Sequence, residues 1–242
     1  MVTGGVSWNA LTYGAHETSS DRNALTYRQH GGIGIYDGYI LDTFRSSHGR
    51  EGRLIRLLSD TQHLPHGVLY GIGVDPNTAL VVTEARTSNE IGEVFGTHGV
   101  SLVDVSKSYV DPFHTYFDIR KVYMSYLTAG DTISMVSHNV SVSSTKTLLT
   151  GNESHTHAVT SSDIFFGASC PAKKTEFLRV AASIVDARKD LYSYGDTYEK
   201  HPRFRVTMSK TGTHTGSWVE RPRTFNSDII SYKNMYLEIN AH

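Results

Sequence analysis

The sequence predicts an α/β fold in which buried strands alternate with helices. Residues 68–74 (VLYGIGV) and 78–83 (TALVVT) are short continuous apolar runs bounded by turn-forming residues, which is typical of strands buried on both faces. Residues 31–41 (GGIGIYDGYIL) are typical of a strand, a turn and a strand. Residues 49–58 lie between them and predict a helix, because apolar side chains occupy one face and arginines the other. Strand, helix and strand in this order indicate an α/β unit.

The second half of the chain predicts a secondary structure that is rich in β-strands. From about residue 92 the sequence alternates between apolar and polar residues in short runs that predict hairpins. These runs are residues 100–105, 121–127 and 132–136, and similar runs close the chain at residues 204–208 and 232–239. Residues 141–162 are rich in Ser and Thr and predict a long exposed loop or hairpin, whereas residues 173–189 predict a second helix.

Composition and charge exclude several classes of protein. The chain has 242 residues, of which 38% are apolar or aromatic, so it can bury a core of ordinary size. It carries 23 Lys and Arg against 24 Asp and Glu, so no basic field predicts a nucleic-acid partner. A single cysteine, Cys170, excludes an internal disulfide and a multi-thiolate metal site. No stretch approaches the ~18 apolar residues of a membrane span, and we expect no cofactor or metal ion.

Two N-glycosylation sequons lie in the polar region, at Asn139 (NVS) and Asn152 (NES). They permit a secreted glycoprotein, and this is the expected location. Residues 1–8 lack the charged start and apolar run of a signal peptide, so a cytoplasmic location is the alternative. The pair His155 and His157 suggests half of a metal site, but 13 histidines in the chain make such a pair expected by chance.

The start of the chain contains a candidate nucleophile. Residues 4–10 (GGVSWNA) are similar to a nucleophile elbow, in which a serine lies on a tight turn from a strand into a helix. Gly5 supplies the small residue before the serine, whereas Asn9 stands where a glycine usually follows. Ser7 is therefore the candidate catalytic serine.

Four later segments resemble motifs of the cyanophycinase-like serine peptidases, in the same order and spacing. They are residues 40–54 (ILDTFRSSHGREGRL), 71–82 (GIGVDPNTALVV), 100–105 (VSLVDV) and 127–131 (LTAGD). The resemblance implies a three-layer α/β/α sandwich related to the class I glutamine amidotransferases. We therefore expect residues 1–140 to form the C-terminal two thirds of such a domain. Residues 141–242 are expected to form a β-rich extension packed on it.

The enzymes of this family use a Ser-His-Glu triad to cleave β-linked Asp-Arg dipeptides. The resemblance places the serine on Ser7, the histidine position on Phe44 and the glutamate position on Pro76. Phenylalanine cannot accept a proton and proline cannot orient a base, so two of the three positions are degenerate. The sequence therefore predicts a pseudoenzyme with a structural, storage or binding role.

A serine hydrolase with a rearranged triad is the alternative function. In this interpretation His48 replaces the lost base and Asp75 or Glu84 supplies the acid, and the substrate is an Asp-containing dipeptide.

In the family, the central parallel strands precede the serine, whereas only six residues precede Ser7 in this sequence. An open sheet of this kind would expose unpaired edges. We therefore expect a homo-oligomer or a partner chain to supply the first strands, unless a longer precursor carries them, and a peptide is the candidate ligand.

One internal repeat has no explanation in the sequence. The pentapeptide NALTY occurs at residues 9–13 and again at residues 23–27.

Overall fold

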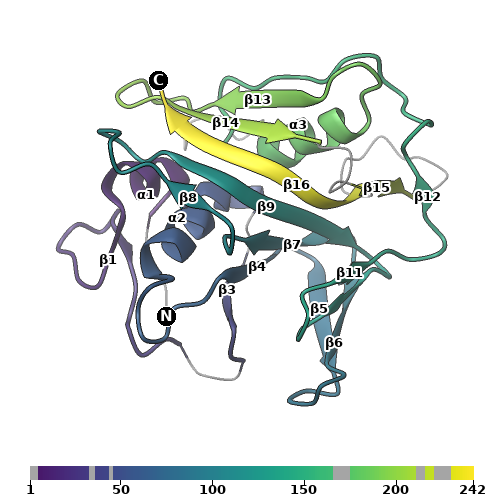
Figure 1. The fold of residues 1–242 in the computed structure, drawn as a ribbon, viewed down its shortest axis with the longest axis horizontal. Helices are drawn as coiled ribbons and strands as arrows, with labels where there is room; N and C mark the ends of the chain where they lie inside the picture. The colour runs from purple at the N-terminus through teal and green to yellow at the C-terminus, as the bar shows by residue number, and fades with distance from the viewer. Residues whose placement is uncertain (1–4, 33–35, 44–45, 166–174, 211–215, 221–229) are drawn as a thin grey trace.

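The computed structural model describes residues 5–32, 36–43, 46–165, 175–210, 216–220 and 230–242. A mixed sheet of ten strands forms the centre of the molecule (Figure 1). Within the described ranges the chain forms sixteen strands but only three α-helices. The structure is therefore mostly β.

The three α-helices are α1 (Ser7–Tyr13), α2 (Glu51–Thr61) and α3 (Glu176–Val185), and a short 3-10 helix, η1 (Ser46–His48), precedes α2. The main path of the ten-stranded sheet runs in the order β12 (Thr147–Leu148), β15 (Gly216–Val219), β16 (Ile230–Ala241), β9 (Ile119–Thr128), β7 (Gly99–Asp104), β4 (Tyr70–Val74) and β3 (Tyr39–Thr43). The remaining strands of this sheet are β8 (Tyr109–Val110), β13 (Tyr192–Asp196) and β14 (Phe204–Ser209), where β8 pairs with β9 and β14 joins β13 to β16.

Two smaller sheets accompany the large one. The first is a four-stranded antiparallel sheet of β11 (Val140–Ser141), β10 (Thr132–Ser134), β6 (Ile91–Gly96) and β5 (Thr78–Thr83). The second is a parallel pair of β1 (Ala15–His16) and β2 (Leu25–Thr26).

The predicted strand–helix–strand unit is confirmed in β3, α2 and β4. β3 and β4 are parallel neighbours, with Tyr39 opposite Tyr70 and Thr43 opposite Val74. The helix α2 lies close to β4 because β4 carries a glycine at the contact. A Cβ atom on Gly71 would lie only 2.9 Å from a methyl carbon of Leu58.

The predicted three-layer α/β/α sandwich is wrong. Such a fold needs a mostly parallel sheet with helices on both faces. Here β4, β7, β9 and β16 pair antiparallel with one another. The three helices contribute to a single apolar cluster on one face of the sheet. The opposite face, around Ile72, Leu102 and Leu127, packs against Val94, Ile133 and Val140 of the four-stranded sheet. A β-layer thus occupies the place that the sandwich assigns to helices.

The later predictions of element type are largely confirmed. Helix α3 falls within the predicted residues 173–189, and β5, β7, β9, β14 and β16 coincide with predicted strands. Strands from both predicted segments belong to the same sheet, since β16 pairs with β9. No described helix has the length and apolar character needed to cross a membrane.

A buried ion pair joins three distant parts of the sheet. Asp131 lies in the turn between β9 and β10, and its carboxylate is 2.7 Å from the ammonium of Lys146, with side chains that are 0% and 1% exposed. The carboxylate also accepts hydrogen bonds from the backbone amides of Thr128 and Ser143, both at 2.9 Å, and from the hydroxyl of Ser231 at 2.5 Å. Burial lowers the pKa of Lys146, and the hydrogen bond to Asp131 opposes that shift.

We predict that Asp131→Ala lowers the free energy of unfolding by about 3–5 kcal/mol, because it leaves the charge of Lys146 buried without its partner. Lys146→Met should cost less, since Asp131 keeps its three other hydrogen bonds. Chemical denaturation of both variants, with exposed Asp37→Ala as the control, measures the difference. An Asp131→Ala variant as stable as the control would contradict the importance of this pair.

Candidate functional site

Ser7 is the first residue of α1 and is buried, with 1% of its surface exposed. Its hydroxyl donates a hydrogen bond to the backbone carbonyl of Gly49 and accepts one from the backbone amide of Arg53 at 3.2 Å. A serine hydroxyl has one proton, so the proton of Ser7 is directed to a carbonyl and not to a base. In this arrangement Ser7 links α1 to the first turn of α2.

Two glycines allow close contacts around Ser7, Gly52 with α1 and Gly49 with Phe165. A Cβ atom on Gly52 would lie 3.0 Å from the Cβ of Ser7. A Cβ atom on Gly49 would lie 1.7 Å from the carbonyl oxygen of Phe165, and Gly49 has a φ of +57°. The positive φ expected of a nucleophile elbow occurs at Gly5, whereas Ser7 has ordinary helical geometry.

Asp75, one of the two candidate acids, is held against η1 and is not bonded to Ser7. Phe44 lies outside the described residues. Asp75 accepts hydrogen bonds from the amide of Ser46 at 2.8 Å and from the hydroxyl of Tyr126 at 2.9 Å. The neighbouring Pro76 lies in the turn after β4.

The candidate replacement base, His48, has an exposed side chain whose Nδ1 lies 2.9 Å from the hydroxyl of Ser47. Glu84, one of the two candidate acids, is exposed at the turn that follows β5. Asp75 is engaged as a structural acceptor. The described geometry therefore does not place a base on the hydroxyl of Ser7.

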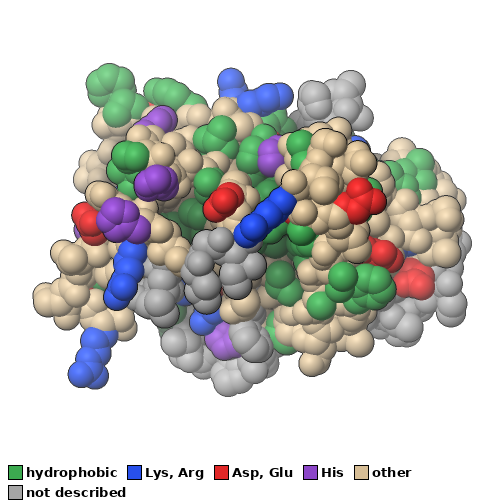
Figure 2. Space-filling model, turned by 90° about the horizontal axis from the view of Figure 1, so that it is seen from below, with side chains coloured by type: hydrophobic (Ala, Val, Ile, Leu, Met, Phe, Trp, Pro, Cys, Tyr) green, Lys and Arg blue, Asp and Glu red, His purple; other side chains and the backbone are tan. Residues whose placement is uncertain are grey.

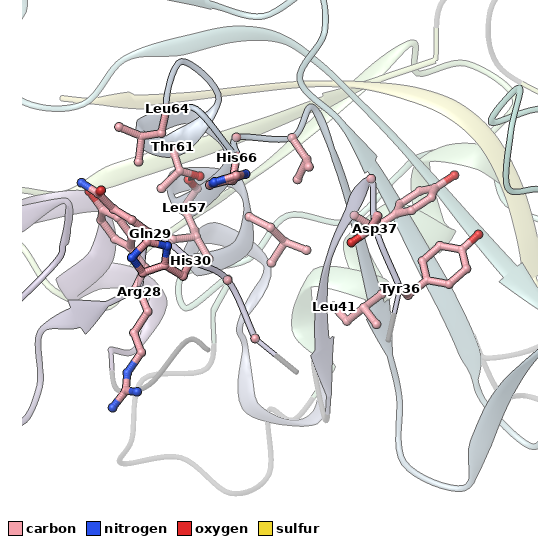
Figure 3. A pocket seen from close by; sticks show the side chains of 18 residues that line it. Arg28, Gln29, His30, Tyr36, Asp37, Leu41, Leu57, Thr61, Leu64 and His66 are labelled. Carbon is pink, nitrogen blue, oxygen red and sulfur yellow. Dashed lines mark hydrogen bonds between the residues drawn. The ribbon is translucent and has the colours of Figure 1, made fainter. Parts of the chain in front are cut away.

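A pocket of about 490 Å³ lies between the second half of α2 and β3 (Figure 3). Its volume falls in the range of small-ligand sites. The loop of residues 27–32 forms one wall, and residues 36–41, which lead into β3, form the opposite wall. Leu57, Leu64 and Val68 contribute apolar surface from α2 and the loop that follows it.

Basic side chains border this pocket. Arg28, His30 and His66 are exposed and line it, and within the described part of the chain none of them has an ion-pair or hydrogen-bond partner for its side chain. Figure 3 shows His30 on the side of the loop, Asp37 on the opposite side and His66 between them, toward the top of the view. Viewed from below, histidine side chains gather toward one side of the molecule, and apolar side chains lie in its recesses (Figure 2). Asp37 is the only carboxylate among the described residues that line the pocket.

An aromatic cluster stabilises the wall of the pocket at β3. The hydroxyl of Tyr39 lies 3.0 Å from the carbonyl of Met135 and 2.5 Å from Nδ1 of His138. The ring of His138 stacks on Tyr70 with centroids 3.6 Å apart. Burial raises the pKa of Tyr39 and lowers that of His138, so both side chains are held in their neutral forms.

Sequence reasoning did not find this pocket. The pattern of residues 31–41 predicts strands with a turn, and the basic residues of the wall are spread over residues 28–66 without a motif. The available signal is the run Tyr27-Arg28-Gln29-His30, which carries two basic side chains beside a tyrosine. Its meaning depends on the fold, which brings residues 64–68 next to it.

The two sequon asparagines and the two histidines of the predicted metal pair lie on the surface and do not form one site. Asn139 and Asn152 are both exposed, as a glycosylation site requires. His155 lies 3.8 Å from Asp186, and the side chain of His157 lies 3.2 Å from Asp190. Cys170 lies outside the described residues.

No protein-family model matches this sequence. The function is therefore inferred from the geometry of Ser7 and of the pocket.

We predict that Ser7→Ala lowers the free energy of unfolding by about 1–3 kcal/mol, because it leaves the carbonyl of Gly49 and the amide of Arg53 without their buried partner. Exposed Ser19→Ala is the matched control and should change stability by less than about 0.5 kcal/mol. Urea denaturation of the two variants measures both values. A Ser7→Ala variant as stable as the wild type would contradict a structural role for this serine.

Proposed function

We propose that this protein is a catalytically inactive binding protein that takes its ligand in the pocket beside β3. The observation that carries the proposal is the position of Ser7, whose buried hydroxyl donates its proton to the carbonyl of Gly49. A serine becomes nucleophilic only when a base accepts its proton and the oxygen can reach a substrate. Neither condition is met by this arrangement.

The pocket supports the binding half of the proposal. It combines apolar surface with a few polar groups, which is the usual character of a ligand site. Arg28, His30 and His66 offer donors that the described residues leave unused. Ser7 does not line this pocket: it contacts Gly52 and Arg53 in the first turn of α2, whereas Leu57 and Thr61, farther along the helix, line the pocket. The proposed binding site and Ser7 are therefore distinct positions in the fold.

A serine-reactive fluorophosphonate probe tests the absence of catalysis. We expect the intact mass of the native protein to stay unchanged after exposure to the probe, because the hydroxyl of Ser7 is neither activated nor exposed. We also expect no hydrolysis of Asp-containing dipeptides. A known serine hydrolase treated in parallel shows that the probe is active.

One probe adduct that disappears in Ser7→Ala but persists in Ser19→Ala would overturn the proposal. That result would favour the serine hydrolase, and the same labelling of His48→Ala would then show whether this histidine is the base.

A further inference from the structure

We propose that the pocket beside β3 binds an extended peptide segment with acidic side chains, which adds to the free edge of β3 and lengthens the large sheet. This inference rests on the proposed binding function and names the class of its ligand. The segment would belong to a partner protein. Its backbone would pair with β3, and its carboxylates would meet the basic side chains of the opposite wall.

The backbone of β3 offers the first argument. β3 is the last strand on its side of the sheet, and within the described residues it pairs only with β4. Thr43 is engaged, since its N–H donates to Asp42 and its C=O accepts from Arg50, but along the rest of β3 the other edge presents unpaired N–H and C=O groups. The four residues before Thr43 make an edge of roughly 13 Å at about 3.3 Å per residue. Four consecutive residues, 38–41, line the pocket, so this edge borders the cavity.

The composition of β3 gives the second argument. Proteins commonly protect an open edge with Lys, Pro or a bulge, and the sequence of β3 (YILDT) contains no Lys or Pro. The register of β3 on β4 is regular over all five residues, without a bulge. Leu41 is 56% exposed on this strand. An unprotected apolar edge of this kind is the usual template for strand addition.

Charge identifies the acidic character of the segment. Arg28, His30 and His66 border the cavity without partners of their own in the described part of the chain. Asp42 on β3 does not offset them, because its carboxylate is held by Arg53 at 2.5 and 2.7 Å. Asp37, on the side of β3, is the carboxylate that lines the cavity, and it lies across the cavity from Arg28 and His30. A charge-assisted hydrogen bond from Arg28, with the N–H donors of His30 and His66 beside it, would select carboxylates on the incoming strand.

A second copy of this chain fits the groove less well. Its β3 would bring the apolar side chains of Tyr39, Ile40 and Leu41, and its only acidic residue, Asp42, is already paired with Arg53. Two basic walls, each carrying Arg28 and His30, would also approach one another. The apolar floor from Leu57, Leu64 and Val68 fits alternate side chains of a strand whose other residues are acidic.

Fluorescence anisotropy with the full chain tests the inference. The probe is a labelled seven-residue peptide of alternating valine and glutamate, compared with the same peptide carrying glutamine in place of glutamate. A third peptide carries glutamate and a methyl group on every second backbone nitrogen, which removes donors that strand addition needs. We expect the first peptide to bind at least about tenfold more tightly than either control, as charge and backbone pairing both contribute.

Matched variants locate the site. Arg28→Ala/His30→Ala should weaken binding of the acidic peptide about tenfold. The control, His16→Ala/Arg22→Ala, removes the same residue types from exposed positions outside the cavity and should leave binding unchanged. All four side chains are exposed, so both variants should fold.

Several outcomes would overturn the inference. These are no binding of any peptide, equal binding of the acidic and glutamine peptides, or equal loss in the two double variants. Concentration-dependent dimerisation in sedimentation that Leu41→Asp abolishes would assign the edge to a second copy. None of these results depends on the fluorophosphonate test, so failure of this inference and failure of catalytic inactivity are distinguishable.

Discussion

The buried ion pair between Asp131 and Lys146 is the constraint on which the arrangement of the sheets depends. Its carboxylate holds the end of β9 through Thr128, the segment before β12 through Ser143 and the start of β16 through Ser231. A buried charge is tolerated only when it is paired and hydrogen-bonded, so these three segments must stay together for the pair to remain satisfied. The strand β10 of the four-stranded sheet follows Asp131 directly in the chain. The pair therefore sets where the β-layer meets the large sheet.

The two ends of α2 have different roles in the proposed function. In its first turn, Gly52 brings the helix so close to α1 that Ser7 is enclosed and serves as a link between backbone groups. Farther along the helix, Leu57 contributes to a cavity that opens beside β3, the last strand of the sheet. Close packing of the two helices thus leaves the hydroxyl of Ser7 without a base and without access to a substrate. The open edge of β3 leaves backbone groups available for binding. Binding without catalysis follows from this division.

Most of the individual elements could be predicted from the sequence, whereas the architecture could not. The face formed by Leu54, Ile55 and Leu58 specifies α2, and the alternating runs specify β7, β9 and β16, because side-chain periodicity is a local property. The resemblance to the cyanophycinase-like peptidases, and not the pattern of the elements, predicts a parallel sheet with helices on both faces, of which the pair of β3 and β4 is found. The chain instead continues after β4 in hairpins, and Val94 and Ile133 of those hairpins cover the second face. Long-range packing decides which element covers each face of the large sheet, and the periodicity of the sequence does not predict it.

The repeated pentapeptide NALTY shows the difference between what local sequence determines and what tertiary contacts determine. Residues 9–13 lie in the helix α1, whereas Leu25 and Thr26 of the second copy form the strand β2. Ala10 and Leu25 then pack in the same small cluster with Leu57. The sequence by itself determined the helix α2, the type of most strands, and the near balance of charge. Only the tertiary structure decided the conformation of each NALTY copy, the enclosure of Ser7 and the basic wall beside β3. The physical reason is that each of these depends on neighbours distant in the chain, and their contacts outweigh the small intrinsic preferences of five residues.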